Sequence, residues 1–254
     1  MKLMFRLMSA ILVIGLVVAA FVARAGAPKT ETVEFKNGTE TVSAFLALPD
    51  TPGPHAAIIV IHEWWGLNEW VKEQAEKFAG LGYVALAVDL YRGKVATDPS
   101  EAHELMRGLP QDRGVKDLEA AITYLGTRKD VRAERIGAVG WCMGGGFSIQ
   151  LAVHDPRLRA CVVNYGALPT DPNDLQQIAA AVLGNFGADD HGITVADVEA
   201  FKKAMTNAQR AFEVKEYPGA GHGFENPNNK DAYRPEAAAD AWARTVNFYK
   251  STLK

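Results

Sequence analysis

Three side chains that together could catalyse acyl transfer follow three separate apolar segments of this 254-residue chain, in the order Cys142, Asp190 and His222. Cys142 lies in "GWCMGG", which has the pattern G-x-nucleophile-x-G. This pattern is typical of a sharp strand-to-helix turn that exposes the nucleophile at a helix N-terminus. The helix dipole and the free N–H groups there favour a thiolate and a developing oxyanion. Taken alone, the motif also fits a buried cysteine beside a glycine-rich turn.

A thiol nucleophile needs a base, and the base needs a group that orients it. Of the histidines, His222 is the best placed, because it follows the last apolar segment in the glycine-rich loop "GAGHGF". Asp190, in "GADD", is the candidate for the orienting carboxylate, and Asp189 beside it is a competitor. The chain order nucleophile, acid, base is that of α/β-hydrolases. Read singly, each residue could equally be an ordinary loop residue.

The arrangement of apolar segments predicts a sheet that would bring these residues to one edge. Strands are expected at 56–62, 83–90, 135–141, 159–165, 180–187 and 211–218, with helices at 68–82, 114–127, 144–154, 195–208 and 234–251. Alternating strands and helices predict a doubly wound, mostly parallel α/β sheet. The alternating pattern around Asn37-Gly38 predicts an antiparallel hairpin before it. In such folds, the chemistry gathers at the carboxyl ends of the strands.

The sequence resembles the dienelactone hydrolase family of α/β-hydrolases from about residue 30 to the C-terminus. The resemblance is carried by "HEWWGLNEW", "DLYRG", "GWCMGG", "GADDHGI" and "GAGHGF". It implies an α/β-hydrolase fold in a single domain over 30–254, and hydrolysis of small esters or lactones without a cofactor. It also implies Cys142 as nucleophile, His222 as base and Asp190 as orienter, because the family pattern G-x-x-D counted from Gly187 ends at Asp190.

The resemblance further implies a role for Glu63, which follows the first strand of the parallel sheet. In the family, a glutamate here meets the resting cysteine, and the thiol stays neutral until substrate displaces the carboxylate. A carboxylate near sulfur favours the protonated thiol and so protects it from oxidation. The oxyanion hole is expected to consist of the backbone N–H groups of Met143, directly after the nucleophile, and of Trp64.

Four residues are candidates for the substrate pocket: Trp65, Tyr91, Arg92 and Tyr165. Ordinary core or rim positions are an equally good reading for the aromatic ones. The founding enzymes of the family hold a substrate carboxylate with arginines. Asn226 stands where one of these is expected, and Arg107 is a weak candidate for the other. The sequence therefore argues against dienelactone itself as the substrate.

Two other functions compete with the acyl-transfer interpretation. A metallohydrolase could use the histidines and acids at the same edge (His62, Glu63, Asp190, His191 and His222), but "HEWWG" lacks the second histidine of H-E-x-x-H. A non-catalytic periplasmic binding module on a hydrolase fold is the other, because fold does not fix function. The formal charge of −3, with acids and bases interspersed, argues against a nucleic-acid partner. Nothing in the sequence sets the oligomeric state, and a monomer is compatible with it.

The first 25 residues have the order of a secretory signal: a basic start, an apolar run and "ARAGA". Cleavage after Ala25 or Ala27 predicts export to the periplasm or secretion, with no stable membrane association afterwards. An uncleaved signal anchor is the alternative, since the apolar run is near the lower length of a membrane span. Cys142 and Cys161 are not expected to pair, because a strand-to-helix corner and a buried strand rarely aim two sulfurs at each other.

Overall fold

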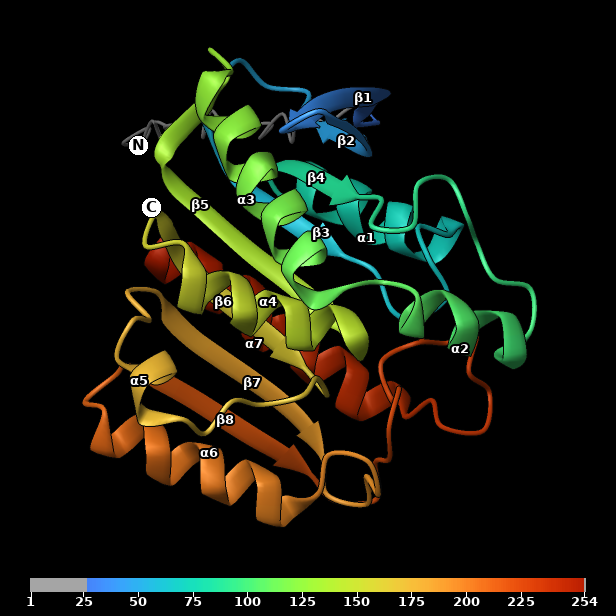
Figure 1. The fold of residues 1–254 in the computed structure, drawn as a ribbon, viewed down its shortest axis with the longest axis vertical. Coiled ribbons are helices and arrows are strands. Elements are labelled where there is room, and N and C mark those ends of the chain that lie inside the picture. The colour runs from blue at the N-terminus through green and yellow to red at the C-terminus, as the bar shows by residue number, and fades with distance from the viewer. Residues whose placement is uncertain (1–26, 254) are drawn as a thin grey trace, which may run out of the picture.

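An eight-stranded sheet runs through the molecule in the order β1-β2-β4-β3-β5-β6-β7-β8 (Figure 1). The structure is a computed structural model and describes residues 27–253. The strands are β1 (Lys29–Asn37), β2 (Glu40–Leu48), β3 (His55–Ile61), β4 (Val84–Val88), β5 (Val131–Trp141), β6 (Leu158–Asn164), β7 (Ala181–Gly187) and β8 (Phe212–Tyr217). β1, β2 and β4 pair antiparallel, and every pair from β4 to β8 is parallel. The predicted doubly wound sheet with an N-terminal hairpin is confirmed.

Helices cover both faces of this sheet, which explains why its central strands are almost continuously apolar. The helices are α1 (Glu69–Gly80), α2 (Pro99–Arg107), α3 (Gln111–Thr127), α4 (Met143–His154), α5 (Pro172–Leu175), α6 (Val195–Asn207) and α7 (Pro235–Thr252). One core lies under α3, α4 and α6 and the other under α1 and α7. Alternate residues of β3 enter opposite cores: Ile59 faces the first and Ile58 the second.

One helix that reaches the site, α2, was missing from the expected elements. Its sequence nevertheless carries start and stop signals: the Asp98 side chain accepts hydrogen bonds from Ser100 and Glu101, Pro99 opens the helix, and Gly108 follows its end. The helix is short and polar and has one buried residue, Ala102, so its sequence contains almost no periodic pattern of apolar residues. Capping residues were therefore the informative signal here, and the hydrophobic pattern was not.

The predicted signal segment, residues 1–25, lies outside the described residues. Within residues 27–253, none of the helices has the length and apolar character needed to cross a membrane.

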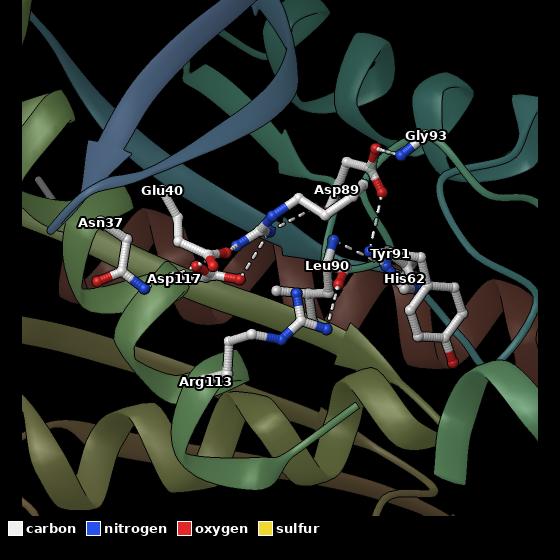
Figure 2. A network of polar contacts seen from close by, with 10 residues as sticks. Asn37, Glu40, His62, Asp89, Leu90, Tyr91, Gly93, Arg113 and Asp117 are labelled. Atoms are coloured by element: carbon white, nitrogen blue, oxygen red, sulfur yellow. Dashed lines mark hydrogen bonds and ion pairs between the residues drawn. The ribbon is translucent and has the colours of Figure 1, made fainter. Parts of the chain in front are cut away.

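A polar network fixes the loop that follows β4 to the hairpin and to α3 (Figure 2). Arg92 makes a two-pronged ion pair with Asp117, at 2.8 and 2.9 Å, and Asn37 donates to the same carboxylate at 2.8 Å. The Asp117 side chain is fully buried. The buried Asp117 carboxylate thus has three hydrogen bonds. Removing Arg92 would leave its charge uncompensated, and removing Asn37 would leave it one hydrogen bond short.

We expect Asp117→Ala to lower the free energy of unfolding by about 3 kcal/mol, because Arg92 and Asn37 lose a buried acceptor. Asp112→Ala on the same helix is the matched control, since that side chain is 73% exposed. It should change stability by less than about 0.5 kcal/mol. Urea unfolding of both variants measures the difference, and equal stability would contradict a structural role for the network.

Candidate active site

Cys142 occupies a strained turn between β5 and α4. Its backbone has φ 55° and ψ −119°, a region that costs a side-chain-bearing residue energy and that only the surrounding packing can impose. A Cβ on Gly140 would lie 2.0 Å from the carbonyl oxygen of Gly144, and one on Gly144 would lie 2.3 Å from that of Ile61. Helix α4 can therefore lie this close to β5 only with glycine at 140, and this close to the end of β3 only with glycine at 144. The turn leaves the Cys142 side chain partly exposed, lining two cavities.

The loop after β8 brings His222 to the same place, and the loop after β7 supplies its partner. The His222 Nδ1 atom lies 2.8 Å from Oδ2 of Asp190. The other oxygen of Asp190 accepts from the backbone N–H groups of Gly192 and Ile193, at 2.7 and 3.0 Å. Asp190 is buried, whereas Asp189 is exposed. Of the two candidate aspartates, Asp190 is the one that contacts the imidazole.

The two partners shift each other's protonation. Burial alone would lower the pKa of His222, but the hydrogen bond with Asp190 and the interaction with Cys142 outweigh it and raise the pKa to about 10. Burial likewise tends to raise the pKa of Asp190, and its hydrogen bonds with His222, Ile193 and Gly192 bring that pKa below its usual value. An imidazolium held between a carboxylate and a sulfur is thereby stabilised.

Glu63 is 5% exposed and lines the same cavity as Cys142 and His222. Its carboxyl accepts hydrogen bonds from Asn226, at 2.6 Å, and from the Tyr165 hydroxyl, at 3.3 Å. Burial raises its pKa, and the two hydrogen bonds oppose that shift in part. Asn226, at the position where an arginine was expected, therefore holds this carboxyl.

The predicted oxyanion hole lies at the start of α4. Met143 is the first residue of that helix, so its N–H group has no acceptor within the helix. Trp64 follows β3 and lines a cavity together with Cys142. The Cys142 N–H group is already engaged, since it donates to the carbonyl oxygen of Asn164 at 3.0 Å.

Two cavities reach the Cys142 side chain. One, of about 490 Å³, is lined mainly by apolar side chains from α2, α4 and the loop after β6. The other, of about 660 Å³, lies between the loops that follow β3, β4 and β8. Met106, Cys142 and His222 line both. Sequence reasoning missed Met106 because it missed α2.

The four predicted pocket residues divide into two groups. Trp65 lines the larger cavity and Tyr165 the smaller. Tyr91 is 5% exposed and donates to the sulfur of Met143 at 3.2 Å, so it packs behind the site without lining a cavity. Arg92 is turned away into the ion pair with Asp117, so the expectation that it lines the pocket is corrected.

Two further candidates for polar roles lie elsewhere. Arg107 is exposed at the end of α2 and lines neither cavity. Both ring nitrogens of the buried His62 are engaged, by the Glu63 carbonyl oxygen at 2.6 Å and by the Leu90 N–H group at 3.3 Å. Within residues 27–253, no group of three or more His, Cys, Asp or Glu side chains could hold a metal ion.

Both cysteines are free. Cys161 is fully buried 3.3 Å from the Ser148 hydroxyl, and burial raises the pKa of its thiol to about 12. Such a thiol is inert at neutral pH, in contrast to one at a helix N-terminus.

A cysteine at a glycine-flanked strand-to-helix turn, with an aspartate and a histidine after later strands of a mostly parallel sheet, defines an α/β-hydrolase. The sequence model of the dienelactone hydrolase family matches residues 42–253. The chain therefore belongs to the dienelactone hydrolase family.

Individual relatives agree with this assignment. A Bradyrhizobium protein named "Probable 2-oxo-3-(5-oxofuran-2-ylidene)propanoate lactonase" is 33% identical over 231 residues, which cover 86% of this chain and 92% of that protein. A Methylorubrum extorquens protein whose name assigns it as a carboxymethylenebutenolidase is 32% identical over 223 residues, covering 82% of this chain and 76% of that protein. The crystal structure of a Klebsiella pneumoniae protein assigned as a dienelactone hydrolase superposes with a TM-score of 0.81 at 28% identity, covering 89% of this chain and 99% of that one.

We expect Asp190→Asn to lower the pKa of His222 from about 10 toward the ordinary value of 6.5, because the variant removes the carboxylate that stabilises the imidazolium. Asp189→Asn is the control and should leave it unchanged. NMR titration of the histidine ring protons measures both. An equal effect of the two substitutions would contradict the pairing seen in the structure.

Proposed function

We propose that the protein hydrolyses carboxylic ester or lactone bonds in small molecules through a Cys142-His222-Asp190 triad and a thioester intermediate. The observation that carries the proposal is the combination of the strained Cys142 turn with the 2.8 Å contact between His222 and Asp190 beside it. Family membership supports the reaction class. The mechanism requires no cofactor.

In the first half-reaction, the Cys142 sulfur attacks the carbonyl carbon of the substrate, with its proton held by His222. The negative charge that develops on the carbonyl oxygen is stabilised by the Met143 and Trp64 N–H groups. When the carbon–oxygen bond breaks, His222 gives the proton to the leaving alcohol. The acyl group then remains bonded to sulfur.

In the second half-reaction, His222 takes a proton from water, and the resulting hydroxide attacks the thioester carbonyl carbon. The carbon–sulfur bond breaks, the acid leaves, and the thiolate is regenerated beside the imidazolium. Asp190 keeps the ring oriented in both halves and stabilises the charge that the ring acquires.

The proposal includes Glu63 as the group that moderates the resting thiol. Its carboxyl lies in the cavity that Cys142 lines and is held there by Asn226 and Tyr165. Negative charge at this position favours the protonated thiol over the thiolate before substrate arrives.

Cys142→Ala should reduce hydrolysis of p-nitrophenyl esters and small lactones by at least about 10³-fold while leaving the fold intact, because no thioester can form. Cys161→Ala is the matched control and should retain activity, since that thiol is buried away from both cavities. Steady-state kinetics and circular dichroism on both variants provide the measurement. Undiminished turnover by Cys142→Ala would refute the proposed nucleophile.

The same kinetic assay, combined with iodoacetamide alkylation of the wild-type protein, distinguishes an enzyme from a non-catalytic binding module. Such a module would be alkylated by iodoacetamide at one equivalent, yet the wild-type protein would turn over none of the esters or lactones. That result would contradict a catalytic function and indicate that the site binds a ligand without turning it over.

Glu63→Gln should speed alkylation of Cys142 by iodoacetamide several-fold at pH 7, because the variant removes the charge that disfavours the thiolate. It should also raise the melting temperature by a few degrees at that pH. Burial raises the pKa of Glu63 above its unfolded value of 4.5, so ionisation in the folded state opposes folding. Below about pH 4.5 the carboxyl is neutral in both states and the gain should vanish.

Glu69→Gln is the control for both measurements, because that side chain is 84% exposed and pairs with Lys72 on the surface of α1. A Glu63→Gln variant with wild-type alkylation rate would remove Glu63 from the mechanism. A stability gain independent of pH would contradict the burial argument.

A further inference from the structure

The two cavities approach the reactive sulfur from different elements and differ in chemistry. The smaller one follows α4, the helix that begins at the nucleophile, with Met143, Gly146 and Phe147 in its wall. The larger one follows the loop that carries His222, with Gly223 and Asn226 in its wall. An ester bound at Cys142 therefore has one space for each of its halves.

The smaller cavity is built to bury hydrocarbon. Its apolar side chains come from four segments of the chain: Met106, Leu109, Phe147, Leu168, Pro169 and Ile193. Gln111 and Gln150 add uncharged amides, and no Asp, Glu, Lys or Arg lines this cavity among residues 27–253. An apolar group that fills this cavity releases water from its own surface and from the cavity wall. The release favours binding by about 25 cal/mol per Å² of apolar surface buried.

The larger cavity carries a cluster of uncharged amides: Asn68, Asn226, Asn228 and Asn229. Asn226 already donates to Glu63 and accepts from the Asn228 N–H group, and Asn68 accepts from the Val71 N–H group. An amide both donates and accepts, which suits hydroxyl groups, so Asn228 and Asn229 are the main candidates to bind them. Trp65 adds a flat apolar surface at the same wall. Glu63 is the one carboxylate among the described lining residues, and no Lys or Arg accompanies it.

Among the described residues, neither wall carries a Lys or Arg that could compensate a negative charge on the substrate. A carboxylate entering the smaller cavity would lose water without gaining such a partner, and one entering the larger cavity would also face Glu63. Arg92, the one cation among the expected pocket residues, is held by Asp117. His222 lines both cavities, and its Nδ1 atom already lies 2.8 Å from Oδ2 of Asp190.

Because Cys142 and His222 line both cavities, the chemistry of the walls assigns the direction of the ester. The acyl group, which stays bonded to Cys142 after the first step, is assigned to the smaller cavity, since that wall is apolar and follows the helix that begins at Cys142. The alcohol, whose oxygen takes its proton from His222, is assigned to the larger cavity, since that wall carries uncharged amides and Gly223 of the His222 loop.

Resting on the acyl-transfer function proposed above, we infer that the substrate is an uncharged ester that joins an apolar acyl group to a hydroxyl-rich alcohol of the sugar or polyol class. The apolar cavity receives the acyl group, and the asparagine-lined cavity receives the alcohol. This specificity differs from that written in the names of the two relatives described above, which both denote hydrolysis of unsaturated lactones that carry a carboxylate.

The inferred preference for an uncharged acyl group is tested with p-nitrophenyl pentanoate and mono-p-nitrophenyl glutarate. The acyl chain ends in a methyl group in the first ester and in a carboxylate in the second, and the two are otherwise the same. With each rate divided by the alkaline hydrolysis rate of the same ester, kcat/KM should favour the neutral ester by at least about tenfold, because the acyl cavity offers the charge no partner. Equal values would overturn the inference.

Gln150→Lys places a cation in the wall of the acyl cavity and should move the ratio toward the glutarate ester by about tenfold or more. Gln150→Met, of similar length and without charge, is the matched control and should leave the preference for the neutral ester in place. Identical ratios in the two variants would show that this wall does not meet the acyl chain.

The alcohol side is tested with methyl 6-O-butyryl-glucopyranoside and cyclohexylmethyl butyrate, which share the acyl group and a six-membered ring but differ in the oxygen-containing groups of that ring. The sugar ester should have the higher kcat/KM. The double variant Asn228→Ala/Asn229→Ala should lower that preference several-fold, mostly through KM, because the two amides lie at the larger cavity and touch no reacting atom. A preference for the cyclohexyl ester would overturn the inference.

The experiments distinguish failure of the inferred substrate class from failure of the proposed function. Turnover of neutral esters without either selectivity would leave the triad intact and reject the substrate class. Absence of turnover on every ester, with the protein folded, would overturn the proposed function and this inference with it.

Discussion

The close passage of β5 and α4 at the glycine pair Gly140 and Gly144 is the constraint on which the site depends. A side chain on Gly140 would collide with the main chain of α4, and one on Gly144 would collide with the main chain at the end of β3, so α4 can approach both strands only with glycine at these positions. The tight turn between them forces Cys142 to φ 55° and leaves its side chain at the end of a helix, partly exposed. The energy of that strained conformation is supplied by the packing of the strand and the helix around it.

The groups around the Cys142 sulfur have pKa values that their neighbours shift in different directions. Asp190 accepts from His222 and two backbone N–H groups, so its pKa falls despite burial. Glu63 has an amide and a phenol as partners, which do not offset burial, so its pKa rises. Two carboxylates beside one sulfur can thus have different roles. Asp190 stabilises positive charge on the imidazole, and in the proposed mechanism Glu63 disfavours the thiolate before substrate binds.

Asn226 sets the electrostatics beside Glu63 and bears on the specificity inferred above. An arginine there would bring a cation to Glu63 and to the larger cavity. The asparagine instead holds Glu63 with a neutral hydrogen bond at 2.6 Å and leaves the cavity without a cation of its own. This lack of a cation is the basis for inferring an uncharged substrate.

The sequence by itself determined the sheet, its hairpin and the segments that carry Cys142, Asp190 and His222, because apolar periodicity and glycine spacing are local properties of the chain. The residues by themselves left Asp189 and Asp190 open, and only the family pattern favoured Asp190. The tertiary structure shows the reason, because the loop after β7 buries Asp190 against His222 and leaves Asp189 exposed. It also decided that Arg92 pairs with Asp117 and that α2 brings Met106 to the sulfur, because contacts between distant segments depend on how elements pack. Cavities are formed by such contacts, and no local pattern in the sequence encodes their shape or charge.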